Sequence, residues 1–152
     1  MLNESLRKYL DKSEVNYSTI SHPTAYTASQ TAQVAHIPGK HMAKVVMVKL
    51  DGKLAIAVLP AHSHVNFMAL QQLAHAKKIE LAREYEFTTE FPHCDVGAMP
   101  PFGDLYGMSV YLADSLRKQD WIVFNGGNHS DLLRMSAEDY LTIAHPTLIP
   151  NC

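Results

Sequence analysis

The sequence has few cysteines and no long apolar run. Of its 152 residues only Cys94 and Cys152 are cysteine, and they lie far apart. No apolar export signal precedes them, so neither secretion nor a disulfide framework is indicated. No segment approaches the roughly 20 apolar residues of a membrane-spanning helix. We therefore expect a cytoplasmic protein without a membrane partner.

A strong excess of either charge is also missing. Lys and Arg total 13 against 15 Asp and Glu, which gives a formal net charge of −2. Non-specific binding to nucleic acid depends mainly on a broad basic face, and this composition does not indicate one. DNA is therefore not an expected partner, and any contact with RNA should be local.

The remaining composition is that of an ordinary folded protein. Apolar residues make up 47% of the chain and charged residues 18%. A chain of this length can bury a hydrophobic core without covalent cross-links. It contains no internal repeat, low-complexity tract or linker, so we expect a single domain over residues 1–152.

Local patterns predict a mixed order of helices and strands. Leu2, Leu6 and Leu10 recur at helical spacing among charged residues, which indicates an amphipathic helix. Asp51 and Gly52 separate two apolar runs, a strong marker of a β-hairpin. The strands are too short for a doubly wound nucleotide fold, so we expect a mixed α/β class. Helices are predicted over 2–15, 27–37, 66–76, 83–87 and from 136 onward, and strands over 16–22, 43–50, 53–60, 77–82, 109–114 and 121–127.

The stretch DVGAMPPFG, residues 95–103, combines two glycines, two prolines and an aromatic residue. Glycine reaches backbone angles closed to other residues, whereas proline fixes φ and removes an N–H donor. Together they hold a loop in one shape. Such a loop suits either a tight surface turn or a site whose backbone N–H groups point at a ligand.

Lys44 stands at the start of an apolar run, in HMAKVVMV. A lysine in this position either extends its ammonium group to water or lies in a cleft that uses the charge. In a cleft, its three N–H donors suit an anionic or ester-oxygen ligand.

The stretch FNGGNHSDLLRM predicts a glycine-rich turn from a strand into a helix-like segment, although the residues leading to 136 fit either a strand or a helix. Gly126 and Gly127 can present N–H groups to an anion, but the stretch lacks the spacing and the lysine of a phosphate-binding loop. The adjacent His129 is either an acid, base or donor of a site, or a helix cap on the surface.

Metal and cysteine chemistry are weakly indicated. His62 and His64 form the closest histidine pair, but no third ligand is near in sequence and the segment reads as a loop. Cys94 follows a histidine, yet a small buried apolar role fits it better than catalysis. We expect no metal and no cofactor.

Four segments in order carry a resemblance to a known family: HPTAYTASQTA, AKVVMVKLDGKLAIAVLP, FPHCDVGAMPPFG and FNGGNHSDLLRM. Along nearly the whole chain they resemble the YbaK/prolyl-tRNA synthetase-associated editing domain family, whose Gly-x-x-x-Pro pattern Gly97 and Pro101 fit. The resemblance implies a compact mixed sheet that curls toward a barrel, with helices around it. It also implies hydrolysis of the ester between a wrong amino acid and the 3′ end of a tRNA, usually tRNA-Pro.

The resemblance implies roles for individual residues. Lys44 matches the site lysine, which would contact the terminal adenosine or its phosphate. Gly97 matches the loop residue whose N–H faces the scissile carbonyl, and His129 matches a site histidine of some alanine-editing members. Tyr26 and Thr27 fall in the segment that lines the amino-acid pocket. The other residues expected at the substrate are Pro101, Phe102, Gly103 and Gly127.

The implied mechanism is direct attack by water. The loop and the hydroxyls of the terminal ribose would position that water, and a preorganised N–H donor would stabilise the developing oxyanion by about 3 kcal/mol. Lys44 would supply position and charge rather than remove a proton. Two departures, TTEFPHCDVG before the loop and Val45 after the lysine, leave the choice among alanine, serine and cysteine open.

A different function on the same fold stays open. A binding module could hold a tRNA end, an oligonucleotide or a nucleotide without hydrolysis, since fold alone does not give activity. With a net charge near zero, the protein would either touch only the acceptor end or gain affinity from a synthetase or an elongation factor.

Overall fold

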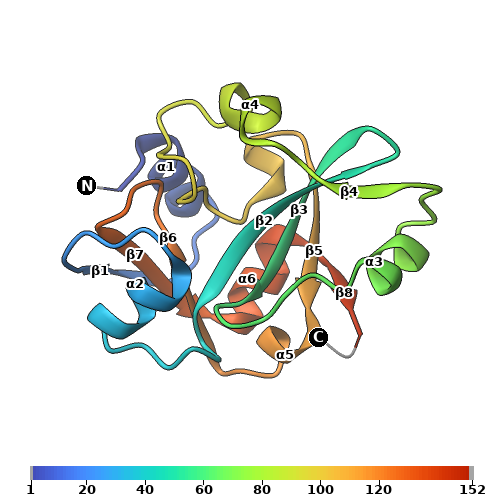
Figure 1. The fold of residues 1–152 in the computed structure, drawn as a ribbon. Coiled ribbons are helices and arrows are strands. Elements are labelled where there is room, and N and C mark those ends of the chain that lie inside the picture. Colours follow the sequence, from blue (N-terminus) through green and yellow to red (C-terminus); the bar gives the residue numbers. More distant parts are fainter. Residues whose placement is uncertain (1, 151–152) are drawn as a thin grey trace.

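The computed structural model describes residues 2–150 (Figure 1). Its helices are α1 (Glu4–Lys12), α2 (Ala28–Val34), α3 (Phe67–Leu73), α4 (Glu84–Phe87), α5 (Asp114–Arg117) and α6 (Ala137–Ala144), with short 3-10 turns at Thr88–Glu90 and Gly103–Leu105. Its strands are β1 (Tyr17–Ser21), β2 (Ala43–Leu50), β3 (Lys53–Pro60), β4 (Ile79–Leu81), β5 (Ser109–Ala113), β6 (Trp121–Asn125), β7 (Asp131–Ser136) and β8 (Thr147–Ile149). The expected mixed α/β class is confirmed.

The strands form two sheets. The first is antiparallel with the order β1-β7-β6, so that the early strand β1 pairs with the late strand β7. The second has the order β4-β2-β3-β5-β8, antiparallel at β2 and parallel from β3 to β8. A single parallel bridge between Met42 and Val123 joins the entry to β2 with β6. Within residues 2–150 the two sheets do not close into a barrel.

Local sequence explains where several elements begin. The side chains of Asn3, Thr27 and Ser136 each accept a hydrogen bond from a backbone N–H in the first turn of α1, α2 and α6. The predicted hairpin is confirmed, and Asp51 and Gly52 both have positive φ, as a two-residue type I′ turn requires.

The structure decides between the strand and the helix predicted for the segment after the glycine pair. Residues 131–136 form strand β7 and not a helix, so the turn at 126–130 joins two antiparallel strands. The Asn128 side chain accepts hydrogen bonds from the N–H groups of Ser130 and Asp131, which shapes this turn. Leu132 and Leu133 are both buried but belong to different apolar clusters, so successive side chains pack on opposite faces of the sheet, as a strand requires.

Three apolar clusters place the helices. The main core takes residues from the inner faces of both sheets, such as Met47, Ile56 and Phe124, and is closed by α1 and α6. Helix α3 covers the outer face of the five-stranded sheet. Helix α2 covers the outer face of the three-stranded sheet, where Met42 and Val123 lie. Figure 1 shows α2 and α3 on opposite sides of the view, with β2 and β3 between them.

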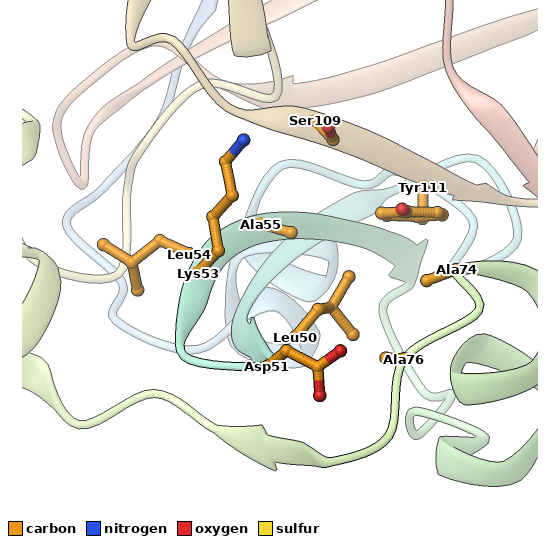
Figure 2. A pocket seen from close by; sticks show the side chains of 9 residues that line it. All are labelled: Leu50, Asp51, Lys53, Leu54, Ala55, Ala74, Ala76, Ser109 and Tyr111. Atoms are coloured by element: carbon orange, nitrogen blue, oxygen red, sulfur yellow. The ribbon is translucent and has the colours of Figure 1, made fainter.

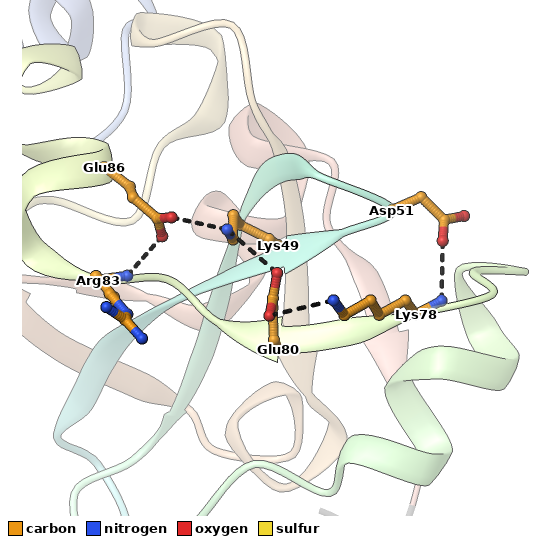
Figure 3. Close-up of polar contacts among 6 residues, drawn as sticks. All are labelled: Lys49, Asp51, Lys78, Glu80, Arg83 and Glu86. Carbon is orange, nitrogen blue, oxygen red and sulfur yellow. Dashed lines mark hydrogen bonds and ion pairs between the residues drawn. The ribbon is translucent and has the colours of Figure 1, made fainter.

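A charged network ties α4 and β4 to β2 (Figure 3). The Lys49 ammonium donates to Glu86 at 2.7 Å and lies 3.1 Å from Glu80. The hydrogen bond from Lys49 lowers the pKa of Glu86 below its ordinary value, and the backbone N–H of Arg83 adds to this. The network therefore fixes the segment that leads toward the loop at 95–103.

Candidate functional site

The loop at residues 95–98 is held by the β6–β7 turn. The N–H of Gly127 donates to Ala98 O at 3.0 Å, and the N–H of Asp95 donates to Gly127 O at 2.8 Å. Gly127 has φ +99°, and a Cβ there would lie 2.8 Å from the Cβ of Asn3 at the start of α1. A side chain at this position would therefore separate the loop from the elements that support it.

Gly97 stands exposed at the turn of the loop. Its φ of +86° lies in the region that favours glycine, and a Cβ there would come within 3.5 Å of the His129 ring. The N–H of Gly97 donates to the sulfur of Met99 at 3.2 Å. A thioether is a weak acceptor, so a negatively charged oxygen would compete well for this donor.

The side chain of His129 also holds the loop, through a hydrogen bond to its backbone. Its Nε2 lies 2.8 Å from the carbonyl oxygen of Val96, and since a carbonyl only accepts, Nε2 carries the hydrogen. The carbonyl of His129 in turn accepts from the N–H of Ala25 at 3.2 Å. The imidazole therefore positions the Gly97 turn, and it is no helix cap, because a strand follows it.

Tyr26 and Thr27 lie beside this histidine. The Tyr26 ring packs against the His129 ring with centroids 4.9 Å apart, yet the residue is 70% exposed. An exposed aromatic face next to a fixed loop can take part in stacking. The Thr27 hydroxyl caps α2 by accepting from Gln30 N–H at 3.1 Å, so its first contact is structural.

The second half of the glycine-proline stretch is buried. Phe102 is fully buried and packs against the rings of Tyr9, Phe124 and Tyr140. The carbonyl of Pro101 accepts from the Tyr140 hydroxyl at 2.7 Å. Gly103 is buried as well. In this structure these three residues anchor the loop in the main core, behind the face that Gly97 presents.

Lys44 lies near the start of β2, opposite Leu59 of β3. It is half-buried and, within residues 2–150, makes no hydrogen bond or ion pair. Burial lowers the pKa of its ammonium group, because a less polar surrounding disfavours the charged form. A partly desolvated cation without a partner is suited to binding an electron-rich group.

Four of the residues predicted for the site lie together in the structure. Tyr26, Gly97, Gly127 and His129 gather around the loop, whereas Lys44 lies in β2 and makes no hydrogen bond to it. Sequence reasoning did not consider Asn125, the last residue of β6, whose Oδ1 is buried and finds no hydrogen-bond partner within residues 2–150. Its place two residues after Val123, on the outer face of the strand, was the signal that could have found it.

The thiol of Cys94 is not set up for catalysis. Burial raises its pKa, and its sulfur lies 3.6 Å from the Tyr106 hydroxyl and 3.7 Å from the Asn3 amide. Cys152 lies outside the described residues. Within residues 2–150 no group of three or more potential ligands could hold a metal ion, and His62 contacts Ser29 instead.

A separate cavity of about 190 Å³ lies away from these residues (Figure 2). The β2–β3 turn, the end of α3 and strand β5 line it, with Lys53, Ala74 and Tyr111 among its residues. None of the residues predicted for the site takes part. No helix in residues 2–150 is both long and apolar enough to cross a membrane.

The comparison with known families gives a clear result. The family model of the aminoacyl-tRNA editing domain matches residues 22–143, which is most of the chain. The chain belongs to this family. Every predicted site residue, from Tyr26 to His129, lies inside the matched span of the editing domain. The resemblance stated from the sequence is thereby confirmed.

Solved structures with the same fold agree with this membership. The hypothetical protein APE2540 has a TM-score of 0.84 at 17% identity, with 95% of this chain and 97% of that chain covered. A candidate trans-editing enzyme for prolyl-tRNA synthetase has a TM-score of 0.82 at 17% identity, with 97% and 96% covered. A candidate signal transduction protein from Marinobacter aquaeolei VT8 has a TM-score of 0.74 at 14% identity, with 97% and 30% covered. No curated protein matches the chain in sequence.

Proposed function

We propose that this editing domain is an aminoacyl-tRNA deacylase that acts in trans, as one domain over residues 1–152. The observation that carries the proposal is the geometry of the loop at 95–98. Gly127 and His129 hold this loop, and the N–H of Gly97 donates only to the Met99 sulfur, which is a weak acceptor. Membership of the editing domain family supports the reaction class. The trans-editing neighbour, named for prolyl-tRNA synthetase, supports tRNA-Pro as the tRNA, and the resemblance stated from the sequence implies that it carries a small wrong amino acid.

The reaction is hydrolysis of an ester. The oxygen of a water molecule bonds to the carbonyl carbon of the aminoacyl group, and the carbonyl oxygen gains negative charge. The bond from that carbon to the ribose oxygen then breaks, and the ribose oxygen takes up a proton. The products are the free amino acid and a tRNA with its terminal hydroxyls restored. Neither a nucleophilic side chain nor a redox partner is required.

Each residue of the candidate site has its own role in this reaction. The N–H of Gly97 leaves the Met99 sulfur to donate to the developing oxyanion, which a fixed loop allows without reorganisation. His129 keeps the loop in place through the Val96 carbonyl. Lys44 binds the sugar-phosphate end of the tRNA, and Tyr26 offers its exposed ring beside the pocket. Because tRNA is charged in the cytoplasm, we place the activity there.

A panel of charged tRNAs tests the proposal. Single-turnover release would be measured for tRNA-Pro carrying alanine, serine, cysteine or proline, with the wild-type protein in excess. We expect rapid release of one small amino acid and little release of proline. Absence of release from every substrate, with binding of the tRNA end retained, would favour the alternative of a non-catalytic binding module.

A further inference from the structure

The Tyr26 ring is an exposed aromatic surface next to the loop at 95–98. The residue is 70% exposed, and its ring lies against the His129 ring with centroids 4.9 Å apart and the two planes at 56°. A tilted contact with one neighbouring ring covers at most one face of Tyr26. The other face is therefore open to a flat ligand.

The backbone on both sides of Tyr26 is fixed. The N–H of Ala25 donates to the carbonyl of His129 at 3.2 Å, which ties the preceding residue to the β6–β7 turn. The following residue, Thr27, caps α2 through its hydroxyl. A tyrosine side chain has only two rotatable bonds, so a ring on a fixed backbone loses little conformational freedom when a ligand packs on it.

The place of this ring matches the build of a charged tRNA end. The imidazole of His129 stands between Tyr26 and the Gly97 turn, because it contacts the Tyr26 ring and its Cε1 lies 3.5 Å from where a Cβ of Gly97 would be. In an aminoacyl-tRNA, the terminal ribose stands between the ester and the adenine base. Imidazole and ribose are both single five-membered rings, so an ester held at the N–H of Gly97 brings the base within reach of Tyr26.

The exposure of Tyr26 favours a base over an amino-acid side chain as its ligand. Alanine, serine and cysteine have very small side chains, and a pocket that recognises a small group encloses it. A ring open to solvent does not enclose such a group. An adenine presents a flat face, and unpaired bases at the ends of nucleic acids bind proteins by stacking on aromatic side chains.

We propose that Tyr26 binds the terminal adenine of the charged tRNA by stacking and thereby holds the aminoacyl ester at the Gly97 turn. The inference rests on the proposed deacylase function. It assigns Tyr26 to the base, whereas the family resemblance implied that its segment lines the amino-acid pocket. The Tyr26 hydroxyl has no part in this contact, and within residues 2–150 it makes no hydrogen bond.

The test combines a change of the ring with removal of the base. Single-turnover release would be measured over a range of protein concentrations on mischarged tRNA-Pro, and on the same tRNA acylated chemically at a terminal ribose that carries no base. On the intact substrate, Tyr26→Ala should raise the protein concentration that gives half-maximal release about tenfold, the effect of losing one stacked base. On the substrate without the base, the wild type should show the same rise, and Tyr26→Ala should add nothing to it.

Matched variants separate stacking from other roles. Tyr26→Phe keeps the ring and should behave as the wild type. Tyr26→Leu keeps an apolar side chain without an aromatic face and should resemble Tyr26→Ala. Tyr85 is 73% exposed on α4, which lies apart from α2 in Figure 1. Tyr85→Ala removes a ring of similar exposure and should leave release from both substrates unchanged.

The other results overturn the inference. An equal defect of Tyr26→Ala on the two substrates would mean that Tyr26 acts through His129 or on the amino acid, and no defect on the intact substrate would remove Tyr26 from binding. A defect of Tyr26→Phe would assign the contact to the hydroxyl. In these cases the wild type still releases the amino acid, so the deacylase function stands. A wild type that releases no amino acid from any charged tRNA would overturn the proposed function, and the role of Tyr26 with it.

Discussion

At the scale of the residue, the site depends on groups held away from their most stable surroundings. Lys44 is half-buried without an ion-pair partner in the described residues, and Gly97 holds a backbone angle that favours glycine. Among the residues that the structure describes, the buried side-chain oxygen of Asn125 has no hydrogen-bond partner. The half-buried charge and the unpaired oxygen each cost folding free energy, whereas glycine adopts a positive φ without strain.

Replacing Lys44 should separate stability from activity. Because burial lowers the pKa of Lys44, the unfolded chain holds this proton more tightly than the folded one. The charge therefore destabilises the fold at neutral pH, and this cost falls as the pH rises between the lowered and the ordinary pKa. Lys44→Met should raise the free energy of unfolding near neutral pH and reduce deacylation on the order of 100-fold. Urea unfolding and single-turnover rates on the same preparations measure both effects, and a destabilised variant would contradict the first.

His129 should act through the loop. His129→Ala removes the donor to the Val96 carbonyl and should slow release about tenfold, in line with the loss of one hydrogen bond. His129→Gln keeps an N–H donor within reach and should restore most of the rate. A side chain that transfers protons would not be replaced by glutamine, so failure of His129→Gln together with a fully folded protein would assign His129 a chemical role.

The sequence predicted local features that depend on a residue's own backbone preferences. It did not predict which distant residues come into contact in the folded protein. The glycines and prolines of 95–103 predicted a rigid loop because their backbone preferences are intrinsic. The contact of His129 with Val96 joins residues 33 positions apart, so no local pattern could indicate it. The same holds for Phe102, whose burial among rings from α1, β6 and α6 depends on the assembled core.

At the scale of the element, local signals worked where side-chain spacing was unambiguous. The β2–β3 hairpin followed from Asp51 and Gly52, and α1 from its leucine spacing. Residues 131–136 were expected to continue as a helix-like segment, yet they pair with β1 and β6. A short run such as DLLRM fits either structure by itself, and pairing on both edges decides in favour of the strand.

The hydrogen bond between Lys49 of β2 and Glu86 of α4 predicts how the free energy of unfolding changes at low pH. The hydrogen bond from Lys49 lowers the pKa of Glu86 in the folded protein, so its stabilising effect is present above the ordinary glutamate pKa. That effect is lost as the pH falls through the lowered pKa. Glu86→Gln should therefore lower the free energy of unfolding at about pH 7 and make little difference at about pH 3. Denaturant titrations at the two pH values measure this, and an equal loss at both would point to packing instead.

At the scale of the whole molecule, the two sheets share an inner core and leave their outer faces to α2 and α3. The site residues gather where the turn after β6, the loop at 95–98 and the start of α2 meet. Parallel pairing at the Met42–Val123 bridge brings β2 to this corner. The candidate site therefore lies at a corner of the fold where hydrogen bonds from Gly127 and His129 hold the loop.

The charge of the whole molecule predicts how it binds tRNA. With 13 basic and 15 acidic residues, the protein should touch few phosphates. The logarithm of its affinity for charged tRNA should therefore fall with the logarithm of salt concentration with a slope shallower than about 3. Fluorescence anisotropy with labelled tRNA at several salt concentrations measures the slope. A value steeper than about 6 would mean an extended basic contact that the composition does not indicate.

The most direct measurement is single-turnover release from tRNA-Pro charged with alanine, serine or cysteine by the wild type, Lys44→Met and Cys94→Ser. The account predicts release of one of these amino acids well above the spontaneous rate for the wild type, an unchanged rate for Cys94→Ser, and a rate lower on the order of 100-fold for Lys44→Met. Equal release by the wild type and Lys44→Met, or release that depends on Cys94, would contradict a deacylase that works through Lys44 and the loop at 95–98.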